Sequence, residues 1–238
     1  MEAYFYGDLV KNEELNKIVK QRKKKYQEIT IPKTLKDTYI GKGWVLKKEF
    51  KYKVRIYKEK QYDELLEDEV WLLFKKMNFL EMNKDRNFKI KAGPIKKQIE
   101  VFAKEENNVF IVECTSSVEG ILNPRKKIHE ISNIKKDIIN SVKKNYGVKS
   151  IQVSLIIATR GIQWTEDDEN LAKKNKIFIW REEELKYYHD LIKHLGNSAK
   201  FQLYSIFFQN KKVYQLKNIR IPAICGGRGR AKYYSFII

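Results

Sequence analysis

Two short apolar segments joined by a polar connection constrain the fold of this chain more than any other part of its sequence. They are Lys97–Ala103 and Val109–Cys114, and the connection is Lys104–Asn108. Segments of this length that are rich in β-branched and aromatic residues are typical of strands, and the short connection predicts a β-hairpin. A lone hairpin is not stable in water, so the rest of the chain has to supply further strands and a cover.

The segments around the hairpin have the patterns of amphipathic helices and buried strands. Asp63–Met77 and Lys126–Asn145 carry apolar residues at spacings of three and four, as expected for helices with one buried face. Ile151–Ala158 is a largely apolar segment, which indicates a strand covered on both faces. The other expected elements are a helix capped by Thr165 and running through Lys174, a strand at Ile177–Trp180, and a helix over Glu182–Leu195 closed by Gly196.

The order of these elements predicts the fold class and the domain organisation. Helix, strand, strand, helix, strand, helix, strand and helix follow one another, which is typical of a mixed α/β sheet with helices on both faces. We expect this core at residues 63–196, after a basic N-terminal extension at 1–62 with a helix at Glu13–Gln27 and one strand at Trp44–Tyr57. Residues 197–238 are expected to form a strand-rich basic tail that begins a further domain.

The charge balance points to a polyanionic partner. The chain has 49 lysines and arginines against 30 acidic residues, a net charge of +19. Such a surplus favours binding to the phosphates of nucleic acid through counterion release. The alternative is that an AT-biased genome encodes many lysines, asparagines and isoleucines without a functional reason. Aromatic residues among the cations of the tail are a second hint of nucleic-acid binding, although such residues more often belong to a core.

Composition also excludes several classes of protein. The two cysteines, Cys114 and Cys225, are too few for a disulfide framework or a zinc cluster, and they favour a reducing compartment. His129, His189 and His194 have no metal-ligand spacing, and we expect them to be structural. The sequence has no apolar run of eighteen residues and no secretory signal pattern at its start. We therefore expect a cytoplasmic protein with no membrane partner.

The predicted hairpin brings two acidic residues face to face. Pairing Val101 with Val112 places Glu100 directly opposite Glu113. Cross-strand partners on one face lie about 5 Å apart at Cβ, where like charges repel each other. Each acid ends an apolar strand, where an unpaired carboxylate is costly. A divalent cation resolves this conflict, because Mg²⁺ is commonly held by one or two carboxylates together with water and phosphate oxygens.

A metal ion held by these acids would favour phosphate chemistry. It would polarise a scissile phosphate and lower the pKa of an attacking water. The simpler alternative is that each acid only caps its strand or pairs with Lys97, Lys126 or Lys127. We favour the metal site, because the facing register and the apolar surroundings occur together.

Five short motifs in this order resemble the PD-(D/E)XK nucleases, the restriction-endonuclease-like family. They are Glu67–Phe79, Gln98–Ala103, Val112–Ser117, Ile156–Gly161 and Lys176–Trp180. Each motif is only moderately specific, and the ordered series is more specific than any member. The resemblance extends over roughly half the chain. It implies a restriction-endonuclease-like mixed sheet flanked by helices, with basic extensions at both ends.

The resemblance also implies roles for individual residues. Glu100 and Glu113 match the two metal-binding acids, the Cys114 carbonyl would be a further ligand, and Glu69 or Glu67 on the first helix would assist. The implied cofactor is Mg²⁺ or Mn²⁺, and the implied activity is hydrolysis of DNA phosphodiesters. The residues expected to contact DNA are Lys97, Gln98, Lys126, Lys127, Arg228 and Arg230. Many nucleases of this type dimerise to cut both strands, so the resemblance also suggests a homodimer, or partners in a defence complex.

One position departs from the family pattern. The family has a lysine two residues after the second acid, where it stabilises the transition state, and this chain has Thr115. A threonine hydroxyl is neutral and short, so it cannot supply that charge. Three explanations stay open. Another cation, among Lys126, Lys127 and Lys97, takes over the role; or the protein is a catalytically silent module that binds DNA or modified DNA; or the residue has been altered.

The flanks of the expected core carry a narrower resemblance. Gly43–Lys48 and Ile219–Arg230 resemble proteins that join such a nuclease to a DGQHR domain, and these proteins are associated with DNA phosphorothioation and bacterial defence. The Asp-Gly-Gln-His-Arg motif itself is absent from the sequence. The resemblance therefore suggests a setting in bacterial defence or DNA modification, to which the expected nuclease would belong.

Overall fold

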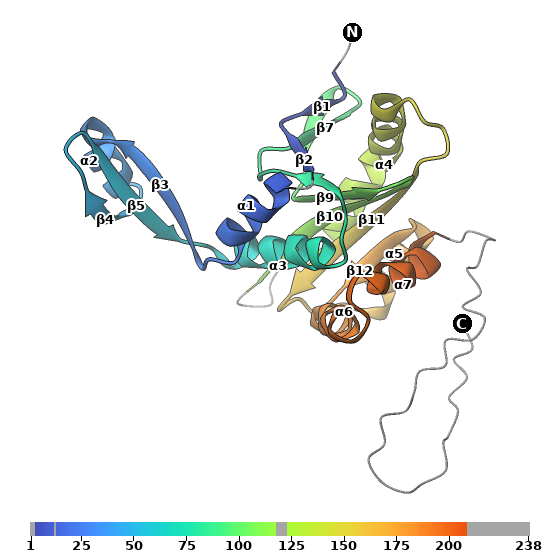
Figure 1. Cartoon of the computed structure of the whole chain (residues 1–238). Helices are drawn as coiled ribbons and strands as arrows, with labels where there is room; N and C mark the ends of the chain where they lie inside the picture. Colours follow the sequence, from blue (N-terminus) through green and yellow to red (C-terminus); the bar gives the residue numbers. More distant parts are fainter. Residues whose placement is uncertain (1–2, 12, 118–122, 209–238) are drawn as a thin grey trace, which may run out of the picture.

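The computed structural model describes residues 3–11, 13–117 and 123–208, and its centre is a six-stranded mixed sheet (Figure 1). The strand order is β12-β11-β10-β9-β6-β2. The strands are β2 Leu9–Lys11, β6 Glu81–Asn83, β9 Val101–Glu105, β10 Asn108–Ser116, β11 Gln152–Arg160 and β12 Ile177–Trp180. Strands β10, β11 and β12 are parallel, and β9, β6 and β2 continue the sheet with antiparallel pairing.

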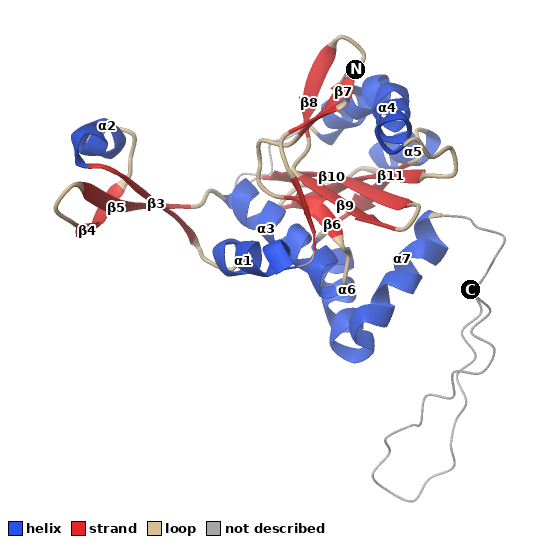
Figure 2. Cartoon of the chain, turned by 45° about the horizontal axis from the view of Figure 1, so that its top comes forward, coloured by secondary structure: helices blue, strands red, loops and turns tan. Residues whose placement is uncertain are grey.

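Helices cover both faces of this sheet, as the sequence predicts (Figure 2). One face carries α1 Glu13–Arg22, α3 Tyr62–Lys76, α6 Glu182–Leu195 and α7 Lys200–Phe207, and the other carries α4 Pro124–Tyr146 and α5 Glu166–Lys174. Because side chains alternate along a strand, Val112 and Cys114 of β10 face α3, whereas Val109 and Ile111 face α4. The predicted mixed α/β sheet flanked by helices is confirmed, and this arrangement is consistent with a restriction-endonuclease-like fold.

The predicted hairpin forms with the expected register, but its first strand is broken. Val101 pairs with Val112 across β9 and β10. The preceding segment, β8 Ile95–Gln98, belongs instead to a three-stranded sheet with order β1-β7-β8. Its other strands are β1 Phe5–Tyr6 and β7 Lys89–Ala92. The chain leaves one sheet for the other at buried Ile99, whose N–H donates to the carbonyl of Phe88 at 2.9 Å.

The N-terminal extension contains a separate three-stranded sheet, which projects from the core in Figures 1 and 2. Its elements are β3 Tyr26–Pro32, β4 Val45–Glu49, β5 Lys53–Glu59, helix α2 Lys36–Ile40 and a 3-10 turn at Lys33–Leu35. The prediction of one strand over Trp44–Tyr57 is wrong. The chain reverses at residues 50–52, where the N–H of Phe50 donates to the carbonyl of Lys53 at 2.8 Å. The predicted helix Glu13–Gln27 likewise ends at Arg22.

The tail begins differently from the expectation of strands. It starts in a 3-10 turn at Gly196–Ala199 and continues with α7, in which Leu203 and Phe207 lie four residues apart and are both buried against the α3 face of the sheet. Residues 209–238 lie outside the described part of the chain, and with them Arg228 and Arg230 of the predicted basic turn. In the part of the chain that the structure describes, no helix is both long and apolar enough to cross a membrane.

Candidate active site

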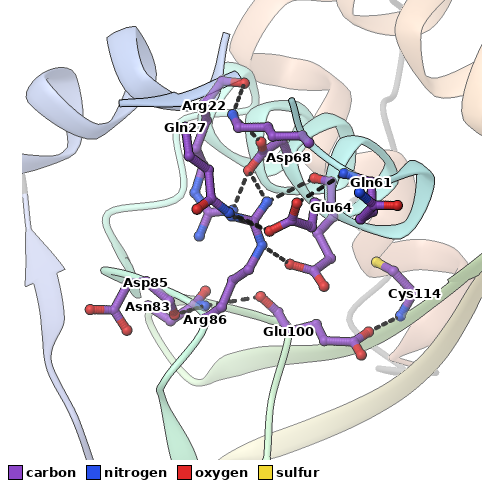
Figure 3. A network of polar contacts seen from close by, with 12 residues as sticks. Arg22, Gln27, Gln61, Glu64, Asp68, Asn83, Asp85, Arg86, Glu100 and Cys114 are labelled. Carbon is purple, nitrogen blue, oxygen red and sulfur yellow. Dashed lines mark hydrogen bonds and ion pairs between the residues drawn. The ribbon is translucent and has the colours of Figure 1, made fainter. Parts of the chain in front are cut away.

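The two acids predicted to face each other meet at the end of the β9–β10 hairpin. Glu113 lies on β10 and is only 4% exposed, and Glu100 directly precedes β9. A carboxylate oxygen of Glu100 accepts a hydrogen bond from the N–H of Cys114 (Figure 3). Because the strand pairing ends at Val101 and Val112, Glu100 reaches β10 through its side chain and not through the ladder.

The surroundings of this pair disfavour two full negative charges. Burial raises the pKa of Glu100 to about 8, and the charge of Glu113 acts in the same direction. The hydrogen bond from Cys114 opposes this shift without cancelling it. Oε1 of Glu113 is buried and has no hydrogen-bond donor among the described residues. The site thus combines one carboxylate oxygen without a partner and one carboxyl group whose charged form is disfavoured.

Two lysines reach the acid pair from different elements. Lys97 of β8 and Lys127 of α4 each place Nζ 2.9 Å from Oε2 of Glu113. Lys97 also lies 3.3 Å from Oε1 of Glu130, whereas Lys127 interacts with the charge of Glu100 as well. Burial lowers the pKa of both lysines, but the neighbouring acids outweigh it, so that both pKa values are raised. Two charged lysines therefore stand at the acid pair.

The other predicted residues on these elements are more exposed. Lys126 is exposed on α4, and Gln98 is exposed at the end of β8. Thr115 is half-buried on β10, two residues beyond Glu113. Its neighbour Ser116 donates from both N–H and Oγ to Oδ1 of Asp63, at 2.6 Å each. This contact, which sequence reasoning did not anticipate, fixes the end of β10 to the first turn of α3.

The Glu69 carboxylate, predicted to assist the metal, contacts other residues. Its two oxygens lie 2.7 Å from Arg160 and 3.1 Å from Nε2 of His189. The hydrogen bond with His189, together with Arg160, lowers the pKa of Glu69 to about 2. Glu67 is the acid of α3 whose charge adds to the raised pKa of Glu100. The sequence motif alone could not choose between Glu67 and Glu69, because both lie on the same helix.

A network of ion pairs on α3 was also missed from the sequence (Figure 3). Oδ1 of Asp68 lies 2.7 Å from Arg22 and 2.9 Å from Arg86, and Oδ2 lies 2.6 Å from Nζ of Lys60. Arg86 also donates to Glu67. These cations come from three separate segments, and each looks like an ordinary surface residue in the sequence. Their convergence on one buried acid is a product of tertiary packing.

The residues at the hairpin end fit a divalent cation. Oε1 of Glu113 is a buried oxygen without a donor, and Glu100 offers a second carboxylate beside it. Mg²⁺ needs no more than one or two carboxylates when water and phosphate complete its shell. The described residues contain no group of three or more His, Cys, Asp and Glu side chains that could hold a metal. Further ligands would therefore be waters, phosphate oxygens or the carbonyl of Cys114.

Comparisons with known proteins add little to this geometry. No protein-family model and no curated protein matches the chain in sequence. Among solved structures, it is similar to Can2 from Sulfobacillus thermosulfidooxidans in complex with cyclic tetra-adenylate, at 17% identity and a TM-score of 0.39 over 75% of this chain and 51% of that one. It is also similar to VC1899 from Vibrio cholerae, at 11% identity and a TM-score of 0.40 over 78% and 51% of the two chains.

A third similar structure is the protein of unknown function AF1548, at 18% identity and a TM-score of 0.38 over 53% of this chain and 67% of that one. The chain spans about half the length of the first two structures. Similarity at this level bears on neither the activity nor the ligand of this protein.

Proposed function

We propose that this protein is a metal-dependent deoxyribonuclease that hydrolyses DNA phosphodiesters at the Glu100–Glu113 pair, with Mg²⁺ or Mn²⁺ as cofactor. The observation that carries the proposal is the buried Oε1 of Glu113, which has no donor among the described residues and lies near Glu100, a carboxyl group whose charged form is disfavoured. Natural proteins rarely leave such an oxygen unsatisfied, and a functional site is one explanation when they do. The ordered motifs similar to PD-(D/E)XK nucleases and the net charge of +19 support the same activity.

Each residue of the site has a distinct role in this proposal. When bound, a divalent cation supplies charge to the scissile phosphate and lowers the pKa of a bound water. Glu100 and Glu113 hold it, and Glu113 also orients Lys127. Lys127 supplies the positive charge that Thr115 cannot, since its charge acts on both acids. Lys97 is shared between Glu113 and Glu130, and we assign it to positioning.

A second candidate function is a catalytically silent module that binds DNA or modified DNA. One observation favours it. Lys97 and Lys127 both contact the same oxygen of Glu113, so two cations already compensate one of the acids, as in a structural ion pair. In either case the proposed partner is DNA, and the proposed setting is bacterial defence or DNA modification, with a homodimer or a defence-complex partner.

Plasmid cleavage with Mg²⁺ or Mn²⁺ tests the two functions against each other. We expect the protein to nick or linearise DNA, and Glu113→Gln to reduce the rate by at least about a hundredfold because it removes a metal ligand. Lys127→Met should reduce the rate by about a hundredfold or more, as expected when a transition-state charge is lost. Adding Thr115→Lys to Lys127→Met should restore part of the rate, because it returns a cation to the family position.

The matched control is Glu81→Gln. Glu81 is also a buried acid on the central sheet, 8% exposed, but its oxygens are satisfied by Lys11, Lys104 and Tyr146. Its substitution should leave cleavage unchanged in a folded protein. The single variant Thr115→Lys is tested as well. If neither the parent protein nor this variant cleaves DNA, and both still bind it, the nuclease proposal is rejected and the binding module remains. If the parent protein does not cleave DNA but Thr115→Lys does, the protein has a metal site that lacks only its lysine.

A further inference from the structure

A cation-lined cavity lies beside α3, apart from the acid pair. It is open to solvent on one side, has a volume of about 340 Å³, and is lined by one face of α3, the end of α1 with the segment that follows it, and His189 of α6. These three helices lie together on one side of the central sheet in Figure 2. Glu113 lies on the opposite side of the sheet, where Lys127 of α4 contacts it. The cavity is therefore a separate site.

Positive charge dominates the cavity. Five cations line it, namely the run Arg22–Lys25 and Lys76, against the two acids Asp68 and Glu69. Both acids are already neutralised, Asp68 by Arg22, Lys60 and Arg86, and Glu69 by Arg160 and His189. Within the described residues, Lys23, Lys25 and Lys76 have no carboxylate within 4.0 Å and are exposed. Three lysine charges are thus free for an anionic ligand.

The floor of the cavity is apolar and belongs to one stripe of α3. Leu65 and Leu72 lie seven residues apart, two helical turns, and both are partly exposed in the cavity wall. An anion alone would gain nothing from such a floor. A ligand that combines phosphate with a flat, weakly polar ring would use both the lysines and the leucines. Pockets of roughly 300 Å³ or more accommodate ligands of this size.

We propose that this cavity binds a nucleotide, with its phosphate on Lys23, Lys25 and Lys76 and its base and sugar over Leu65 and Leu72. The same chemistry has two sources, a free mononucleotide or one nucleotide of a nucleic-acid strand. Ligand binding in this cavity does not depend on cleavage at the acid pair. It gives the basic run between α1 and β3 a role in ligand binding.

The test measures binding without divalent metal, using AMP, inorganic phosphate and a short single-stranded oligodeoxynucleotide. The variant is Lys23→Ser/Lys25→Ser/Lys76→Ser, which alters only exposed side chains. We expect its affinity for AMP or for the oligonucleotide to fall by about tenfold or more, because charge-assisted contacts to phosphate are lost. Loss of AMP binding identifies a free nucleotide as the source, and loss confined to the oligonucleotide identifies a strand.

Two further variants keep the result interpretable. Lys173→Ser/Lys174→Ser removes exposed lysines from α5 on the opposite face of the sheet and should leave both affinities nearly unchanged. Leu72→Asn keeps every charge, and it should weaken AMP binding more than binding of inorganic phosphate, because only AMP has a base to place on the floor. If the triple lysine variant loses no more affinity than the α5 control for any probe, the cavity is not a nucleotide site.

Discussion

Two groups of carboxylates in the core of this molecule are compensated to different degrees. On α3, Asp68 contacts Arg22, Lys60 and Arg86, each at less than 3 Å. At the end of the hairpin, Glu100 and Glu113 lie close enough for one charge to oppose the other, and one oxygen of Glu113 has no donor among the described residues. Both groups belong to the same domain core, so burial alone does not explain the difference.

The number of carboxylate oxygens that have a cationic partner separates structural acids from candidate functional ones. A buried acid surrounded by cations holds segments together, and losing it leaves those cations uncompensated. Glu113 is compensated at one oxygen only, by Lys97 and Lys127, so its other oxygen and the neighbouring Glu100 are available to a ligand that brings positive charge.

The pKa of a carboxyl group on α3 follows the balance of burial and partners. His189 and Arg160 lower the pKa of Glu69 to about 2. Burial raises the pKa of Glu67 despite Arg86, as it raises the pKa of Glu100 to about 8.

The largest effect on stability is expected from Asp68→Ala. The change leaves Arg22 and Lys60 buried without their acid, and breaking a buried ion pair in this way costs about 3–5 kcal/mol. The free energy of unfolding in urea measures it. Asp190→Ala makes the same chemical change at an exposed position of α6 and should stay within about 0.5 kcal/mol of the parent. Similar losses in both variants would mean that the α3 network is not a structural unit.

Glu100→Gln should change the pH dependence of stability in the metal-free protein. The pKa of Glu100 is raised from 4.5 to about 8, so the folded state retains a proton that the unfolded state releases. Stability therefore falls as pH rises from about 4.5 to about 8, and the variant should lose this fall. Unfolding curves at several pH values measure the slope. An unchanged slope in Glu100→Gln would show that this carboxyl group is not held in its neutral form.

Glu69→Gln is expected to have the smallest effect and the opposite pH dependence. Glu69 has a pKa lowered from 4.5 to about 2, so its stabilising contribution is complete above 4.5 and is lost as pH falls toward 2. At neutral pH the partly exposed contacts with Arg160 and His189 should contribute about 1 kcal/mol or less. Thermal unfolding at neutral and acidic pH measures both. A larger loss at pH 3 than at pH 7 would contradict the assigned direction.

The main elements and the facing acids could be predicted because their signals are local. The apolar stripes over 63–77 and 126–145 locate α3 and α4 to within two residues, since a helix repeats its buried face every three or four positions. The register of the hairpin follows from its polar connection, and it brings Glu100 to the strand that carries Glu113. Both results depend on residues that are close in sequence.

Other features had no local signal. The break at Ile99 moves β8 into a second sheet, and nothing in the alternation of 97–103 marks it. The alternation over 44–57 continues through the reversal at 50–52, so one strand and two strands have the same pattern. The short strands β1, β2, β6 and β7 have two to four residues each, too few for a periodic signal.

The sequence by itself determined the α/β class, the flanking helices other than α7, and the pair of acids that nominates a site. Only the tertiary structure decided which cations meet those acids. It placed Lys97 and Lys127, thirty residues apart, on one oxygen of Glu113, and it directed Glu69 to Arg160 and His189. The physical reason is that secondary structure follows from spacing along the chain, whereas charge compensation depends on distance in space, which is set by packing of segments far apart in sequence.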